Sequence, residues 1–250
     1  MSDLGDWYRG VPQFTRAWFT GTVALSLLGR FGLINPINLI LLYEGVKRFQ
    51  IWRLVTCVLY YPLSPATGFH YLINLYFLYT YSRRLEEGHY QGRPADYAYL
   101  LIFNWILCII IGIAADMPLL MDAYVLSIIY VWCQLNKDTI VTFWFGTRFK
   151  AIFLPWVLLI FNLVLAGGGM MELVGILVGH LYFFLAYKYP QELGGPALLT
   201  TPGFLKNWFP EEVGGVHGFG QAPERPPGVP RGPGMFRGHN WGQGHVLGGN

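Results

Sequence analysis

The chain has 250 residues, of which 54% are hydrophobic and only 12% are charged. A soluble domain of this length carries about 25% charged residues, so much of this surface faces something other than water. The net charge of +3 is too small, and the basic residues are too dispersed, to indicate a nucleic-acid partner. The three cysteines have no metal-ligand spacing and are interpreted as small core residues: Cys57, Cys108 and Cys133.

Six apolar stretches follow one another in residues 17–190, after a polar segment at residues 1–16 that has no signal-peptide core. A helix that spans a bilayer needs about 17–25 residues, so several of these stretches are short spans. We therefore predict an all-α polytopic membrane protein with a bundle of six transmembrane helices. The predicted spans are Ala17–Ile34, Phe69–Tyr81, Tyr97–Ala115, Leu119–Leu135, Ala151–Ala166 and Leu173–Tyr189.

The connection between the first two spans, residues 35–66, is too long for a hairpin turn and is rich in aromatic and aliphatic residues. A connection of this length needs structure of its own, and we expect it to lie partly embedded in the outer interface. Lys and Arg residues gather on the opposite side of the predicted bundle, which the positive-inside rule places in the cytosol. Six spans then put both termini in the cytosol.

From Gln191 onward, glycine and proline dominate the sequence. Such a tract buries too little apolar surface to fold alone, so residues 191–250 are predicted to form a flexible cytosolic arm. Its last dozen residues include isolated apolar side chains, Trp241 and Leu247. They indicate a short partner-binding motif; the alternative is tail composition without a function.

Nucleophilic catalysis requires an activated serine, and an intramembrane serine protease carries it on a glycine-rich turn. The sequence contains no Gly-x-Ser-Gly or Gly-x-Ser-x-Gly, and Ser127 in the fourth span has the bulky neighbours Leu126 and Ile128. His180 is a conceivable base, although a lone membrane histidine is more often a packing or hydrogen-bonding residue. The sequence also lacks a His-Glu-x-x-His motif and a phosphate-binding loop, so we expect no metal, cofactor or ATP site.

Two acidic residues, Asp122 and Glu172, lie near the outer ends of the fourth and sixth spans. Charged groups are costly inside a bilayer, so their positions are informative. Either they reach the outer interface and cap their helices, or they line a water-filled cavity that opens to the outer side. Polar residues combined with short spans would make this region wet and locally thin.

A glycine pair in the sixth span, Gly175 and Gly179, forms a GxxxG pattern. Two glycines four residues apart leave a smooth stripe on a helix, which lets a neighbouring backbone approach closely. The pattern is common in membrane helices, so it predicts helix packing and by itself implies no function.

Several motifs resemble those of the rhomboid superfamily. Ile51-Trp52-Arg53-Leu54-Val55-Thr56 resembles its Trp-Arg motif, His70-x-x-x-Asn74 resembles a motif of rhomboid proteases, and Gly175-x-x-x-Gly179-His180 resembles their sixth span. Longer strings resemble the Derlins, the rhomboid pseudoproteases of the endoplasmic reticulum. These strings are Asn74–Tyr79, Gly92–Tyr97, Phe143–Lys150, Gly179–Phe184 and, as in the Derlin-one branch, the tail string His239–Gly244.

The resemblance implies a rhomboid-like six-helix fold with a large first lumenal loop, in which Trp52 and Arg53 are the signature pair. It also implies a place in the endoplasmic reticulum membrane and a part in degradation, in which misfolded lumenal and membrane proteins return to the cytosol for ubiquitination. Ubiquitin ligase complexes would be partners, a homo-oligomer is expected, and no protease nucleophile is expected. Candidate cavity residues are Asn74, Asp122, Glu172 and His180.

Derlin tails also carry a short hydrophobic-glycine motif that recruits the valosin-containing AAA ATPase. In this chain the corresponding residues are Trp241, Gly242, Gly244 and Leu247. The motif departs from the family pattern at His245 and Val246, where an aromatic and a basic residue are usual.

Two other classes of function compete with this interpretation. An active intramembrane protease would use His70, Asn74 and His180, but the absent nucleophile opposes it more strongly. A small-molecule transporter would show an inverted internal repeat and paired broken helices, and the sequence shows neither.

Overall fold

The computed structural model describes residues 2–143, 146–166, 168–192, 194–196 and 198–211. This part of the chain is mostly helical, with one small antiparallel hairpin formed by β1 (Ile140–Thr142) and β2 (Arg148–Lys150). The prediction of a mainly helical fold is confirmed, and the small hairpin is an addition that was not predicted. Ile140-Val141-Thr142 is a run of β-branched residues, which favours a strand, and Val141 pairs with Phe149.

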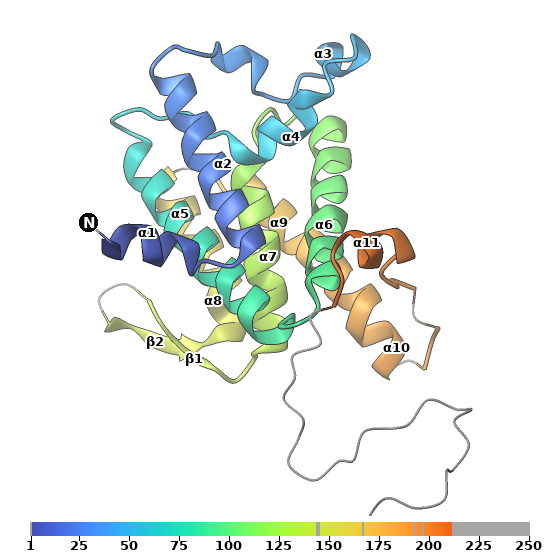
Figure 1. Cartoon of the computed structure of the whole chain (residues 1–250). Helices are drawn as coiled ribbons and strands as arrows, with labels where there is room; N and C mark the ends of the chain where they lie inside the picture. Colours follow the sequence, from blue (N-terminus) through green and yellow to red (C-terminus); the bar gives the residue numbers. More distant parts are fainter. Residues whose placement is uncertain (1, 144–145, 167, 193, 197, 212–250) are drawn as a thin grey trace, which may run out of the picture. The chain divides into compact units, whose positions relative to one another are not determined.

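Six helices of the described part form the bundle, and each overlaps one of the six predicted apolar stretches (Figure 1). They are α2 (Gln13–Arg30), α5 (Gly68–Arg84), α6 (Pro94–Ala114), α7 (Met121–Leu135), α8 (Leu154–Ala166) and α9 (Met170–Phe183). By length and composition, two helical segments of the described part are long and apolar enough to cross a membrane, Pro94–Ala114 and Met170–Glu192.

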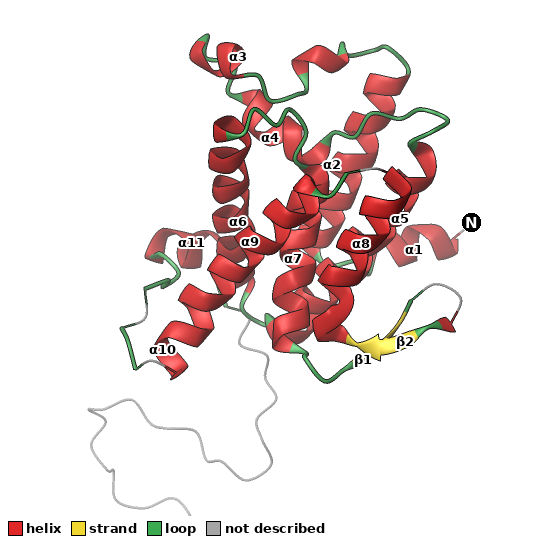
Figure 2. Cartoon of the chain, turned by 180° about the vertical axis from the view of Figure 1, so that it is seen from behind, coloured by secondary structure: helices red, strands yellow, loops and turns green. Residues whose placement is uncertain are grey.

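Helix α7 is the centre of the bundle and packs against α5, α6, α8 and α9. Every residue from Ala123 to Cys133 is buried. Viewed from behind, α8 and α9 lie in front of α7, with the hairpin below α8 (Figure 2). A helix that is apolar all round requires such a central position, because it has no polar face to present to water.

The contact between α7 and α9 is the closest in the bundle, and it depends on the two glycines. A Cβ atom added at Gly175 would lie 2.6 Å from the Ala123 carbonyl oxygen, and one added at Gly179 would lie 2.6 Å from that of Ser127. Both distances are too short for any other residue. The GxxxG stripe thus faces α7, and the two backbones touch along it.

The end of the bundle that carries residues 31–67, here called the first-loop end, contains α3 (Tyr43–Lys47) and α4 (Trp52–Leu59). Arg53 holds it together and is only 5% exposed. Its guanidinium donates to the carbonyl oxygens of Ile37 and Ile40, the latter at 2.9 Å, and to the Gln50 side chain at 2.6 Å. Because the planar fork satisfies several acceptors at once, a single arginine organises this loop.

Trp52, the other signature residue, lies at the surface of the same end. Its side chain is 51% exposed, and its indole nitrogen donates to the Asn38 carbonyl oxygen at 3.3 Å. An exposed indole with one anchored polar atom is typical of a residue at a membrane interface.

The opposite end, here called the hairpin end, carries α1 (Ser2–Arg9), the hairpin, α10 (Tyr189–Glu192) and α11 (Gly203–Trp208). The Glu86 carboxylate accepts from the backbone nitrogens of Phe14 and Thr15 at 2.9 and 2.8 Å, which caps the first turn of α2.

Helix α11 lies inside the segment that the sequence predicts to be flexible. Leu205 in this helix is 2% exposed, and the Phe14 and Phe209 rings lie 4.9 Å apart. The folded part therefore continues beyond Gln191, because a few apolar side chains pack against α6 and the start of α2.

Candidate functional site

A cavity of about 670 Å³ lies at the first-loop end, where α5, α7, α8 and α9 approach the first loop. Its lining combines apolar side chains with six polar ones, which come from the first loop and from four helices. The polar side chains are Tyr61, Thr67, His70, Asp122, Asn162 and Glu172. A narrower space next to it reaches Asn74. Polar groups brought together in a mostly apolar bundle are the usual mark of a binding site.

Three of these contacts form a chain of hydrogen bonds. The Tyr61 hydroxyl lies 2.7 Å from His70 Nδ1, and His70 Nε2 lies 3.2 Å from Asn162 Oδ1. The Asn162 amide then donates to Glu172 Oε1 at 2.5 Å. Since the Asn162 oxygen can only accept, His70 carries a proton on Nε2, and the chain ends on the Glu172 carboxylate.

Asp122 occupies the other side of the same site. Its Oδ1 accepts from the Asn74 amide at 2.6 Å, and the same amide nitrogen lies 3.3 Å from His70 Nδ1. Asp122 and Glu172 each lie in the first turn of their helix, where the helix dipole favours a carboxylate. Both residues therefore lie at the start of a helix and line the cavity, and the opening of this cavity to the outer side of a membrane stays a prediction.

His180 does not join this site, which corrects its assignment as a cavity residue. Its side chain is exposed, and its Nδ1 lies 2.7 Å from the Tyr130 hydroxyl. His180 follows Glu172 by eight positions on α9, a rise of about 12 Å along the helix axis, so it lies at a different level of the bundle. Ser127 is buried and donates its hydroxyl to the Tyr124 carbonyl oxygen at 2.7 Å.

Sequence reasoning missed the polar cavity residues Tyr61, Thr67 and Asn162, and it named His70 only as part of a motif. Asn162 carried a usable signal, because it is the lone amide in the otherwise apolar helix Leu154–Ala166. Tyr61 carried none, since it is one of several aromatic residues in the first loop. The predicted tail motif, Trp241, Gly242, Gly244 and Leu247, lies outside the described residues.

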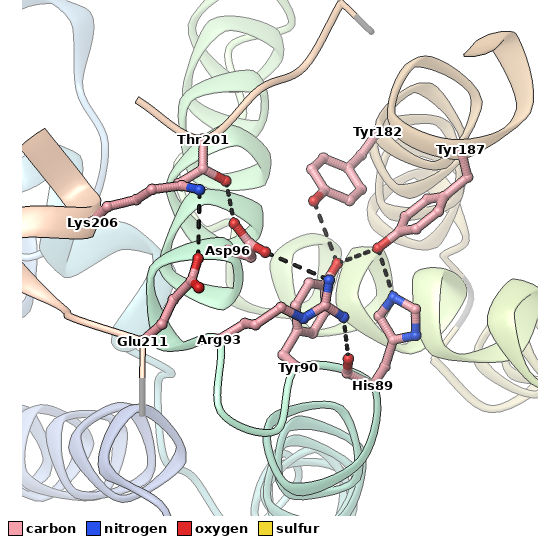
Figure 3. Close-up of polar contacts among 9 residues, drawn as sticks. All are labelled: His89, Tyr90, Arg93, Asp96, Tyr182, Tyr187, Thr201, Lys206 and Glu211. Atoms are coloured by element: carbon pink, nitrogen blue, oxygen red, sulfur yellow. Dashed lines mark hydrogen bonds and ion pairs between the residues drawn. The ribbon is translucent and has the colours of Figure 1, made fainter. Parts of the chain in front are cut away.

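A second polar network lies at the hairpin end, where the loop after α5 meets the end of α9 (Figure 3). The Tyr187 hydroxyl lies 2.7 Å from that of Tyr90 and 3.0 Å from His89 Nε2, and the Tyr90 and Tyr182 hydroxyls lie 3.4 Å apart. Burial lowers the pKa of His89, and the nearby positive charge of Arg93 lowers it further. The neutral imidazole is therefore the favoured form.

The same network holds the segment that carries α11. Arg93 donates to the His89 carbonyl oxygen at 2.6 Å and pairs with Asp96 at 3.6 Å. Asp96 in turn accepts from the Thr201 hydroxyl at 2.5 Å (Figure 3). Polar contacts thus add to the burial of Leu205 in keeping this segment against α6.

The described part is thus a helical bundle with two helices that could cross a membrane by length and composition, a first loop organised by Arg53 and a polar cavity, and this combination is typical of a membrane protein. Comparison with known proteins makes this assignment specific. The model of the Der1-like family matches residues 11–203, and the chain belongs to this family.

Several curated relatives match the chain over nearly its full length. It is 55% identical to Derlin-1 of Homo sapiens over 249 residues, which cover 99% of each chain. It is 51% identical to Derlin-1 of Caenorhabditis elegans over 255 residues, which cover 99% of this chain and 100% of the relative. Identity to Derlin-1 of Drosophila melanogaster is 47% with the same coverage. The resemblance to the Derlins, and to their Derlin-one branch, is confirmed.

Proposed function

We propose that this protein helps misfolded lumenal and membrane proteins to return from the endoplasmic reticulum to the cytosol for degradation. In this proposal all six bundle helices span the membrane, the first-loop end faces the lumen, and both termini are cytosolic. The observation that carries the proposal is the polar cavity, which lies within a mostly apolar bundle and whose lining includes His70, Asp122, Asn162 and Glu172. It offers hydrogen-bonding groups to a polypeptide segment that has left the lumen.

Short helices support the same function. Helix α7 has 15 residues and α8 has 13, so they rise by about 22 and 20 Å, whereas the hydrocarbon core is about 30 Å thick. A bilayer next to such helices becomes thinner. Thinning and a polar cavity together lower the cost of moving polar backbone across the membrane.

We further propose that the protein has no proteolytic activity. The sequence lacks a serine in a glycine turn, and the Ser127 hydroxyl is bonded to a carbonyl oxygen of its own helix. The rival interpretation is an active rhomboid-type serine protease. It predicts that a fluorophosphonate probe labels Ser127 and that His180→Ala abolishes the labelling. Absence of labelling together with intact degradation of substrates supports the pseudoprotease.

The work of extraction has to come from a partner, because the sequence contains no phosphate-binding loop. The tail motif around Trp241 and Leu247 is proposed to recruit the valosin-containing AAA ATPase, and ubiquitin ligase complexes and further copies of this chain are proposed as membrane partners. A synthetic peptide of residues 237–250 should retain the purified ATPase. The same peptide with both anchors replaced by alanine should not.

The decisive experiment measures the half-life of a misfolded membrane reporter in cells that lack the endogenous protein. Re-expression of the full chain should shorten the half-life. A chain without residues 241–250 should insert normally and bind the reporter but fail to release it. An unchanged half-life on re-expression, with the protein in the correct membrane, would exclude the proposed function.

A further inference from the structure

We propose that the polar cavity is selective for positively charged side chains, so that the preferred substrates are membrane segments that carry an unpaired lysine or arginine. This inference rests on the proposed function and names its substrate class. It is drawn from the charge balance of the cavity, in which two carboxylates, Asp122 and Glu172, have no cation beside them among the ion pairs of the described residues.

The carboxylates are held in place by neutral groups. Asn74 donates to Asp122 at 2.6 Å, and Asn162 donates to Glu172 at 2.5 Å. An ionised carboxylate has about four acceptor positions, so one amide donor leaves most of its capacity unused. Glu172 is only 6% exposed, where water can compensate little. An ionised carboxylate in this position is stabilised most by an oppositely charged group next to it.

His70 is the one group in the cavity that could supply such a charge internally, and its contacts identify it as neutral. The Asn74 amide nitrogen only donates, and it lies 3.3 Å from His70 Nδ1. Nδ1 is therefore an acceptor without a proton, and it also receives the Tyr61 hydroxyl at 2.7 Å. The remaining proton on Nε2 faces Asn162. The network thus points donors towards the carboxylates without adding a positive charge.

This arrangement ranks the side chains that enter the cavity. A lysine or arginine gains an ion pair with Asp122 or Glu172, and a neutral polar side chain gains a hydrogen bond alone. An aspartate or glutamate meets like charges at short range, which disfavours binding. The cavity volume of about 670 Å³ leaves room for such a side chain together with water.

The ranking matches a physical property of misfolded membrane proteins. A lysine or arginine at the centre of a spanning helix costs about 2.5–3.5 kcal/mol on insertion scales, so in a folded assembly it faces a partner. A segment that has lost its partner exposes this charge within the bilayer. The cavity then offers a carboxylate at membrane depth, and recognition depends on the sign of the charge.

The test uses three single-span reporters that are identical except for one central residue, which is lysine, glutamine or glutamate. Each is expressed with the wild-type chain, with the double variant Asp122→Asn/Glu172→Gln, or with the control variant Asp138→Asn. Asp138 is a suitable control, because it is an exposed carboxylate at the hairpin end that pairs with Lys150 at 2.8 Å. The half-life of each reporter and its recovery with the purified protein are measured.

We expect wild-type protein to degrade the lysine reporter fastest. The double variant should lengthen the half-life of that reporter about tenfold more than it lengthens the half-life of the glutamine reporter, a difference equivalent to 1.4 kcal/mol of lost interaction. Asp138→Asn should change none of them. Asp122→Glu, which keeps the charge, should retain the preference for lysine.

Three outcomes would overturn the inference. They are equal degradation of all three reporters by wild-type protein, equal slowing of all three by a double variant of normal thermal stability, and loss of the preference in Asp122→Glu when the thermal stability of that variant is normal. Each of these leaves the proposed function intact. Failure of the wild-type protein to shorten the half-life of any reporter would instead contradict the proposed function itself.

Discussion

The two polar networks of this protein differ in what their members contact. At the first-loop end, Tyr61, His70, Asn162 and Glu172 form a hydrogen-bonded chain along the wall of a cavity of about 670 Å³. At the hairpin end, Tyr90 and Tyr187 contact each other and the ring of His89, and aromatic side chains surround them. The first network presents polar groups to a space, and the second joins one part of the chain to another.

This difference assigns function to the network at the first-loop end and stability to the network at the hairpin end. Groups that line a space keep part of their hydrogen-bonding capacity for an incoming segment, so their loss should impair activity more than folding. Groups that satisfy one another in a packed network stabilise the fold, and a buried partner left alone costs free energy. Substitutions at the first-loop end should therefore reduce activity more than stability, and substitutions at the hairpin end should reduce stability more than activity.

The largest effect is expected where both networks depend on one contact, the seam between α7 and α9. Gly175→Leu and Gly179→Leu each place a side chain against the α7 backbone, and each should cost about 1–3 kcal/mol of stability. The combined variant Gly175→Leu/Gly179→Leu should lose the hydrogen bonds of both polar networks. Thermal unfolding in lipid nanodiscs measures the loss.

Gly68→Leu is the matched control for the seam, because a Cβ atom at this position would meet nothing within 4 Å. Its unfolding temperature should stay close to that of the wild type. Equal destabilisation by the control and the seam variants would show that leucine is harmful in any helix here and that the close approach is not the cause.

An effect confined to the first-loop end is expected from Arg53→Ala. The change leaves the carbonyl oxygens of Ile37 and Ile40 without their donor, and an unsatisfied buried acceptor costs about 1–3 kcal/mol. Hydrogen exchange should increase in residues 35–60 and remain unchanged around Tyr90. Degradation of a misfolded reporter should slow, because the loop that forms one wall of the cavity is loosened.

Lys47→Ala is the control for the loop, since this exposed side chain pairs with Glu44 and should not matter for exchange or activity. Increased exchange around Tyr90 in the Arg53 variant would contradict the separation of the two ends.

Much of this organisation was predictable from the sequence. Hydrophobic periodicity and composition are local, so the six helices and the glycine seam could be read directly, and so could the unusual carboxylates Asp122 and Glu172. Asn74 was found through a motif spacing. These features share one property, since each depends on residues that are close together in the chain.

The missed features depend on distant contacts. Tyr61 and Asn162 meet through His70, and the ends of this chain of contacts are separated by about one hundred residues. Helix α11 is short and has little propensity to form alone, so the burial of Leu205 against the bundle decides its structure. His180 was misplaced because it was assigned to the cavity through a motif, although its separation of eight positions from Glu172 along one helix already places it about 12 Å away.

A pair of hydroxyl deletions compares the two networks directly. Tyr187→Phe removes contacts to Tyr90 and His89 and should cost about 0.5–1.5 kcal/mol of stability with normal degradation activity. Tyr61→Phe should change stability less, because water in the cavity can replace the hydroxyl at His70, and should slow degradation more. Unfolding temperature and reporter half-life are measured on both variants. The reverse pattern would assign function to the hairpin end.

The smallest expected effect is a pH dependence that belongs to the hairpin end. Burial and Arg93 lower the pKa of His89 in the folded protein from its ordinary value of 6.5. Below that ordinary value the unfolded chain binds the proton more readily than the folded chain, so stability is full above pH 6.5 and declines as the pH falls through 6. His89→Gln should flatten this part of the profile, because glutamine has no proton to gain. Asp138 does not interfere, because Lys150 lowers the pKa of its carboxyl from 3.8, and its contribution changes only in more acidic solution. Unfolding measurements from pH 7.5 to 5 on both proteins test this assignment. A slope that persists in His89→Gln would place the titrating group elsewhere.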